Sequence, residues 1–244
     1  MTAKINAAES IRGLACLAVV FSHLAMSFFP FLHHFDPTET TDLNWVYQVH
    51  HLPLGFLYSG DAAVFVFFVL SGYVLSYAIL KKPEQFQSRL KSMMVKRYPR
   101  LMIPALTSCL IIWATLSIID IDSRHVGLWL QAFAQQDFSF KTALYEGTIG
   151  AFLFSDSNIN WVLWTMTIEL MGSFVLFFLL VLYQWKHGVF WLGSVLVLVL
   201  AYMWRGQGFC MGIASFVIGI YIYLYAKQLS VWFAVLLLIL GLYL

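Results

Sequence analysis

Residues 59–80 read SGDAAVFVFFVLSGYVLSYAIL and carry one charged side chain, Asp61, near their start. A bilayer core of about 30 Å is crossed by roughly 20 consecutive apolar residues in an α-helix, so this stretch predicts a transmembrane helix. The pattern as a whole predicts an all-α fold, a polytopic bundle of about seven transmembrane helices in one membrane-embedded domain over residues 1–244. The other apolar stretches lie at 11–30, 101–119, 161–183, 189–204, 209–226 and from 231 onward.

The composition also indicates a protein dissolved in lipid. Hydrophobic residues make up 61% of the 244 residues and charged residues 11%, whereas soluble domains average roughly 45–50% and about 25%. Too few polar side chains remain to cover a soluble surface, which excludes ordinary globular, disordered and coiled-coil proteins. The net charge of +2 leaves no basic stripe for nucleic acid. The three cysteines lie in apolar runs without a CxxC pair, which favours small core residues over disulfide or zinc partners.

Basic residues orient the chain across the membrane. The connection 81–100, KKPEQFQSRLKSMMVKRYPR, carries seven of the fourteen Lys and Arg residues. Loops rich in these residues stay on the cytoplasmic side, so we expect both this connection and the N-terminus to be cytoplasmic. Only three basic residues then fall on the outer side: Arg124, Lys141 and Arg205.

Two stretches do not fit a simple series of spans. Residues 121–160 are long for a loop, and their mixed pattern predicts interfacial or re-entrant helix. The segment from 231 offers about 15 residues, or about 22 Å of helix, and no polar stop follows it. We therefore expect this sequence to end where a longer protein continues.

The first apolar stretch contains two ionisable side chains, Arg12 and His23. Their separation is just over three helical turns, so both project from nearly the same face, about 16 Å apart along the axis. Glu9, three residues before Arg12, is expected to pair with its guanidinium. Singly, Arg12 fits a snorkelling interfacial cation, and His23 fits a packed histidine that hydrogen-bonds a neighbouring helix. Their shared face favours function, because one side chain can hold an anion while the other takes a proton.

Glu169 is an acid inside an apolar stretch, in the sequence NWVLWTMTIELMG. A carboxylate at that depth needs a cation or a shared proton as its partner. It therefore marks either a functional acid or a structural buried ion pair. Asp61, by contrast, lies where a helix N-cap would explain it.

The motif Arg97-Tyr-Pro-Arg100 directly precedes the predicted span 101–119. Two guanidiniums three residues apart, at the membrane surface and beside a helix N-terminus, suit a phosphate clamp. The alternative interpretation is positive-inside charge that touches anionic lipid headgroups.

Other polar motifs point to chemistry less strongly. The adjacent pairs His33-His34 and His50-His51 point apart on a strand or loop, so we expect no metal site there. Ser71 is not in a G-x-S-x-G sequence, and Ser71-Gly72 is expected to let two helices approach closely.

Five segments together resemble the acyltransferase type 3 family of integral membrane O-acyltransferases. IRGLACLAVVFSH resembles the arginine–ten residues–histidine signature of its first helix, and GDAAVFVFFVLSGYVLS resembles its glycine-flanked second helix. KRYPRLMIPAL is similar to the arginine-rich start of its third helix, and WVLWTMTIEL to its tryptophan–threonine–glutamate segment. FCMGIASFVIGIYIYLY is similar to a later small-residue helix. Family members usually have about ten such 20-residue spans, which implies that the C-terminal third is missing here.

The resemblance implies transfer of an acyl group, commonly acetyl from acetyl-CoA, to a hydroxyl of a cell-envelope carbohydrate, a lipid-linked sugar or a similar acceptor. It further implies a plasma membrane of the bacterial inner-membrane type and no metal. Two alternatives are a proton-coupled transporter and an inactive structural fragment of a longer acyltransferase. Carried over by position, the catalytic group comprises His23, its partner Arg12 and the intramembrane acid Glu169, while Arg97 and Arg100 hold the phosphates of the acyl-CoA.

Overall fold

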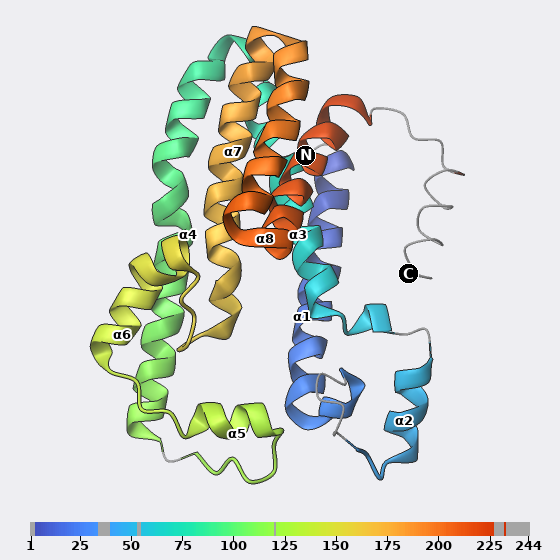
Figure 1. Cartoon of the computed structure of the whole chain (residues 1–244), viewed down its shortest axis with the longest axis vertical. Helices are drawn as coiled ribbons and strands as arrows, with labels where there is room; N and C mark the ends of the chain where they lie inside the picture. Colours follow the sequence, from blue (N-terminus) through green and yellow to red (C-terminus); the bar gives the residue numbers. More distant parts are fainter. Residues whose placement is uncertain (1–2, 34–39, 53–54, 120, 227–231, 233–244) are drawn as a thin grey trace. The chain divides into compact units, whose positions relative to one another are not determined.

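The computed structural model describes residues 3–33, 40–52, 55–119, 121–226 and 232. Most of these residues are helical and none of the described ones lies in a β-strand, so the predicted all-α class is confirmed (Figure 1). The chain divides into two compact units. One contains Met1–Phe67, Asp120–Gln136 and Gln228–Leu244, and the other contains Phe68–Ile119 and Asp137–Lys227.

The first unit is built on α1 (Ala3–Phe28). The chain around α5 (Leu128–Ala134) is fastened to the C-terminal end of α1 by two hydrogen bonds. The Gly127 N–H donates to the Ser27 carbonyl oxygen at 2.7 Å, and the Trp129 indole N–H donates to the Met26 carbonyl oxygen at 2.9 Å. The other elements are η1 (Pro30–Leu32), α2 (Asn44–His51), η2 (Gly55–Leu57) and the first turns of α3 (Gly60–Leu80).

The second unit is a bundle of long helices in which α7 (Thr165–Trp185) and α8 (His187–Tyr225) lie side by side (Figure 1). α8 consists of two arms that fold back on each other at Gly206, whose φ of 78° is accessible to glycine without steric cost. The arms meet where the Tyr221 hydroxyl donates to Ser194 Oγ at 3.2 Å. The remaining elements are the rest of α3, η3 (Pro83–Gln85), α4 (Phe86–Ile118), α6 (Phe140–Tyr145), the π-helix η4 (Glu146–Phe154) and η5 (Trp161–Trp164).

Among the described residues, five helices are long and apolar enough to cross a membrane. The last of them, His187–Tyr225, contains the stretches predicted at 189–204 and 209–226, one on each arm. Six of the seven predicted spans therefore have a helical counterpart, and the chain is a membrane protein. The stretch from 231 lies outside the described residues except for Trp232. The other four helices are Asn6–Phe28, Gly60–Leu80, Pro83–Ile118 and Trp161–Trp185.

α4 runs unbroken from Phe86 to Ile118, with Pro99 and Pro104 inside it. The prediction that residues 81–100 connect two helices is therefore wrong from Phe86 onward, where the chain is already helical. A proline in a helix interior removes one hydrogen bond and favours a kink, but tertiary packing can keep the helix continuous. The motif Arg97-Tyr-Pro-Arg100 consequently lies within a helix, and the helix N-terminus expected beside it lies at Phe86 instead.

The segment predicted as interfacial or re-entrant helix follows α4 lengthwise. The Phe140 ring lies 5.0 Å from the Trp113 ring, measured between centroids, and further on the Tyr98 hydroxyl donates to the Thr148 carbonyl oxygen at 2.9 Å. Fifteen residues of helix separate Trp113 from Tyr98, or about 22 Å. Phe140 and Thr148 are only eight residues apart, or about 12 Å of helix, so α6 and the start of η4 pack along α4 between Trp113 and Tyr98.

Glu146 is a buried acid that holds the chain where it turns back from η4 toward η5. Glu146 is only 2% exposed, and it accepts hydrogen bonds from Asn158 Nδ2 at 2.8 Å and from the Ile159 N–H at 2.9 Å. The next residue, Asn160, donates to Ser108 Oγ of α4 at 2.9 Å. These bonds determine where α7 begins, because η5 and α7 follow directly.

α3 and the second arm of α8 cross back to back at Gly72 and Gly219. A Cβ atom on Gly72 would lie 2.3 Å from the Phe216 carbonyl oxygen, and one on Gly219 would lie 2.2 Å from the Val69 carbonyl oxygen. Contacts this short with backbone atoms can be relieved only by moving the helices apart. The close approach predicted at Ser71-Gly72 is thereby confirmed at Gly72.

Replacing Gly219 with valine is expected to lower the free energy of unfolding by about 1–3 kcal/mol, because the helices must separate. Denaturant unfolding in detergent micelles measures the change. The control is Gly208→Val in the same helix, where nothing lies within 4 Å of an added Cβ, and it should shift stability by less than about 0.5 kcal/mol. Equal losses in both variants would contradict the packing described for this crossing.

Candidate active site

A buried polar cluster joins three helices of the second unit. Glu169 on α7 accepts hydrogen bonds at Oε1 from Ser71 Oγ on α3, at 2.7 Å, and from Arg97 Nη2 on α4. Ser173 lies one turn after Glu169. It accepts a hydrogen bond from Arg97 Nε at 2.6 Å and donates to the Glu169 carbonyl oxygen at 2.6 Å. Arg97 is therefore the cation partner that the depth of Glu169 required.

Bulk solvent reaches little of this ion pair, since the Arg97 and Glu169 side chains are 9% and 13% exposed. A buried charge is costly unless it is paired and hydrogen-bonded, so each of the two groups depends on the other. Arg97 Nη1 and Glu169 Oε2 have no hydrogen-bond partner among the residues that the structure describes. The cluster can therefore offer one donor and one acceptor to a ligand.

Arg12 on α1 forms the ion pair that its spacing predicted. Its Nη1 lies 3.2 Å from Glu9 Oε1, with the two side chains 40% and 60% exposed. Exposed pairs of this kind add little to stability. Most of the guanidinium's capacity to bind an anion is therefore still available.

The ring of His23, also on α1, is held in one orientation. Nδ1 lies 2.8 Å from the Val19 carbonyl oxygen. A carbonyl oxygen can only accept, so Nδ1 carries a proton, and in the neutral ring Nε2 presents its lone pair. Within the described ranges, Nε2 has no hydrogen-bond partner. The half-buried imidazole is thus in the tautomer that accepts a proton at Nε2.

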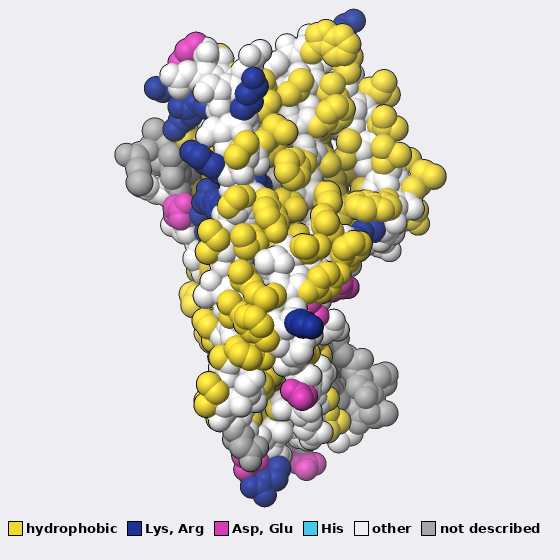
Figure 2. Space-filling model, turned by 90° about the vertical axis from the view of Figure 1, so that its left-hand side faces the viewer, with side chains coloured by type: hydrophobic (Ala, Val, Ile, Leu, Met, Phe, Trp, Pro, Cys, Tyr) yellow, Lys and Arg dark blue, Asp and Glu magenta, His cyan; other side chains and the backbone are white. Residues whose placement is uncertain are grey.

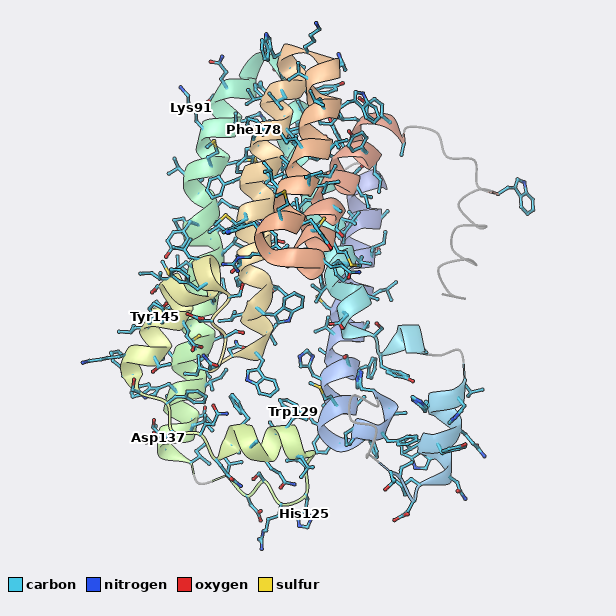
Figure 3. The ribbon with its side chains drawn as sticks, viewed as in Figure 1. Lys91, His125, Trp129, Asp137, Tyr145 and Phe178 are labelled. Atoms are coloured by element: carbon cyan, nitrogen blue, oxygen red, sulfur yellow. The ribbon has the colours of Figure 1, made fainter. Side chains whose placement is uncertain are left out.

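The two arginines of the third motif differ in their surroundings. Arg97 is buried, whereas Arg100 is exposed together with Lys96, one turn earlier on α4. Lys91 is exposed on the same helix and points away from the bundle (Figure 3). Lys and Arg side chains gather over the N-terminal half of α4, next to a broad hydrophobic surface (Figure 2). Basic charge is therefore concentrated on this part of α4.

The residues predicted to form one site fall in both units. Arg12 and His23 belong to the first unit, and Arg97, Arg100 and Glu169 belong to the second. Within the second unit the structure joins Arg97 to Glu169 and leaves Arg100 on the surface. That all five act together stays a prediction from the sequence.

Comparison with protein families decides what kind of protein this is. A family model described as an acyltransferase domain matches residues 5–244. The chain belongs to the acyltransferase type 3 family. No curated protein and no solved structure matches it. Together with its membrane-spanning helices, the family makes the protein a membrane acyltransferase.

Ser71 and Ser173 belong to the buried cluster of the acyltransferase, but the sequence does not predict them as members of a site. Ser71 is interpreted as a close-approach residue because it precedes Gly72, and no motif surrounds Ser173. One signal exists: Ser173 lies four residues after Glu169, so the two share a helix face. The identity of the cation has no such signal, because periodicity along one helix does not say which arginine another helix will contact.

Other polar groups of the acyltransferase have structural partners. Ser59 Oγ accepts from the Ala62 N–H at 3.3 Å, so Ser59 takes the capping position expected of Asp61. Asp61 lies in the first turn of α3, where the helix dipole favours an acid. Of the two histidine pairs, His34 lies outside the described residues. Each of the other three places a ring nitrogen near a backbone carbonyl oxygen: His33 near that of Ser22 at 3.0 Å, His50 near that of Leu32 at 3.1 Å and His51 near that of Tyr47 at 2.8 Å.

Proposed function

We propose that this acyltransferase moves an acetyl group from acetyl-CoA to a hydroxyl of a cell-envelope carbohydrate, such as a lipid-linked sugar. The proposal places it in the plasma membrane, the inner membrane of a bacterium, with the N-terminus and residues 81–100 on the cytoplasmic side. The observation that supports it best is the ring of His23, whose Nδ1 is tied to the Val19 carbonyl while Nε2 stays available. An imidazole in this state is the usual general base for a hydroxyl at neutral pH.

The reaction follows from that tautomer. Nε2 of His23 takes the proton of the acceptor hydroxyl while the hydroxyl oxygen attacks the thioester carbonyl carbon. The tetrahedral intermediate collapses, the carbon–sulfur bond breaks, and the imidazolium returns the proton to the CoA thiolate. Ester and free CoA are the only products. The Val19 carbonyl fixes the tautomer, a role that a carboxylate has in a serine-hydrolase triad.

The charged groups have separate roles in this proposal. Glu169 orients His23 or stabilises the imidazolium that forms there, as the third member of a catalytic triad does. Arg97 and Arg100 hold the phosphates of acyl-CoA, with Arg100 supplying exposed charge and Arg97 supplying its free Nη1. Arg12 meets the pantetheine or phosphate end of the donor, because its partner Glu9 is exposed and easily displaced.

Replacing Arg100 with glutamine is expected to raise the KM for acetyl-CoA by about tenfold or more, because a charge-assisted phosphate contact is lost. The turnover number should change much less, since the contact is equally strong in the ground and transition states. Steady-state kinetics with acetyl-CoA varied measures both values. Lys186→Gln, at the C-terminal end of α7, is the matched control and should leave KM unchanged. A fall in turnover at constant KM would contradict donor binding by Arg100.

Transfer of label tests the proposed function itself. Purified protein in detergent is incubated with acetyl-labelled acetyl-CoA and an alkyl glucoside, and we expect alkali-labile label on the glucoside. A proton-coupled transporter built on the same ionisable residues, or an inactive fragment, would give no thioester-dependent label. Absence of label with a broad panel of alcohols would overturn the proposal.

A further inference from the structure

Arg205, next to the Gly206 turn between the two arms of α8, forms no ion pair with an acid among the residues that the structure describes. Its Nη1 donates to Ser155 Oγ at 2.8 Å, and its Nη2 donates to the Leu153 carbonyl oxygen at 2.6 Å. Both acceptors are neutral. In the described part of the chain no carboxylate oxygen lies within 4.0 Å of this guanidinium. The positive charge is therefore held in place without being neutralised.

The groups that Ser155 and Thr167 contact behind Arg205 are also neutral. Ser155 donates to Thr167 Oγ1 at 3.0 Å, and Thr167 donates to the Ala151 carbonyl oxygen at 2.6 Å. Ser155 ends the π-helix η4 in the left-handed conformation, with φ 63° and ψ 25°. A residue other than glycine keeps that conformation only where its surroundings hold it, and both such residues and π-helices concentrate at functional sites. Arg205 thus donates a hydrogen bond to a residue that is held in a left-handed conformation.

Two aromatic rings flank the guanidinium. Its central carbon lies 4.8 Å from the ring centroid of Trp204 and 5.9 Å from that of Phe209, and the rings meet edge to face at 5.4 Å. Trp204 is 59% exposed, so this arrangement opens outward. Aromatic faces attract a cation, and tryptophan favours the membrane–water boundary. A positive charge and an amphipathic tryptophan therefore lie together at the turn between the two arms of α8.

We propose that Arg205, Trp204 and Phe209 bind the anionic headgroup of an amphiphile through a phosphate or a carboxylate. Ser155 and Leu153 take two of the five N–H groups of Arg205, and the planar guanidinium can donate with the remaining ones to either group. The rings contact the apolar part next to the charge. Arginine is disfavoured on the outer side, where the proposed orientation places Arg205, and a bound anion accounts for its presence there. The anion comes either from a phospholipid or from the acidic group of a lipid-linked acceptor.

Calorimetric titration of the purified protein in a neutral detergent tests this site without requiring activity. The probes are dihexanoylphosphatidylglycerol, octyl phosphate, octyl glucuronide and the neutral octyl glucoside. The wild-type protein is expected to bind the anionic probes about tenfold more tightly than octyl glucoside, since charge-assisted hydrogen bonds contribute at least that factor. Arg205→Gln should abolish the preference. Arg205→Lys should keep part of it, because the charge remains without the planar fork.

Arg124→Gln is the matched control. Arg124 is exposed and already donates to both carboxylate oxygens of Asp122, at 2.9 and 2.6 Å, which lowers the pKa of Asp122 below its usual value. This variant should keep the full preference for anions. Tighter binding of the phosphatidylglycerol identifies a phospholipid as the source, and tighter binding of the glucuronide identifies a sugar-bearing acceptor. A wild-type protein that binds all four probes equally, or an Arg205→Gln protein that keeps the preference, would overturn the proposal.

Discussion

Replacing His23 with glutamine is expected to reduce kcat for acetyl transfer by about 10²–10⁴-fold, the range that a general base contributes. The variant loses the Nε2 lone pair that takes the hydroxyl proton. It should still fold, because the glutamine side chain can donate to the Val19 carbonyl oxygen as Nδ1 of His23 does. Initial rates at saturating acetyl-CoA measure the loss, and unchanged KM for acetyl-CoA would place the effect on chemistry.

His51→Gln is the control for this substitution. His51 on α2 makes the same local contact, with Nδ1 2.8 Å from the Tyr47 carbonyl oxygen four residues earlier, but it is exposed. Any effect of losing a helix-bound imidazole as such would appear in both variants. Equal activity of the His23 and His51 variants would remove His23 from the mechanism.

The second large effect is expected at the buried ion pair. Arg97→Met alone leaves the Glu169 carboxylate without its cation, which should cost about 3–5 kcal/mol of stability. Glu169→Gln alone leaves the Arg97 guanidinium unpaired and should also destabilise strongly. Combining the two removes both charges, so stability should recover by several kcal/mol while transfer activity stays lost. Unfolding in detergent and the transfer assay report the two properties separately.

The four proteins form a double-mutant cycle, and its coupling energy is the decisive quantity. A large favourable coupling between Arg97 and Glu169 is expected, because Arg97 Nη2 donates to Glu169 Oε1 and both side chains are largely buried. Additive losses would mean that the pair is not formed. Full activity in the neutral double variant would show that the pair is purely structural.

Most of the helical layout could be predicted from the sequence because bilayer thickness sets a length that apolar stretches must match. The span at 59–80 became α3, and the two stretches at 189–204 and 209–226 became the arms of α8. The pairing of Glu9 with Arg12 was also predictable, since it depends only on helical periodicity.

Features that depend on tertiary packing could not be predicted in the same way. The apolar stretch 101–119 suggested a helix start beside Arg100, yet packing keeps α4 continuous through Pro99 and Pro104. The depth of Glu169 showed that a partner was needed, but the choice of Arg97 is made by the crossing of α4 and α7. Ser155 has no sequence signal, because a left-handed residue after a π-helix is imposed by its surroundings, and the sequence does not show which groups the Arg205 guanidinium contacts.

The balance between CoA released and ester formed tests the proposed acyl transfer most directly. Purified protein is given acetyl-labelled acetyl-CoA with octyl glucoside, and free thiol and labelled ester are measured in the same sample. We expect one thiol for each ester in the wild-type protein, no release without the hydroxyl acceptor, and loss of both products in His23→Gln. Thiol release without ester, or transfer that is undiminished in His23→Gln, would contradict a His23-dependent acyl transfer from acetyl-CoA to a hydroxyl.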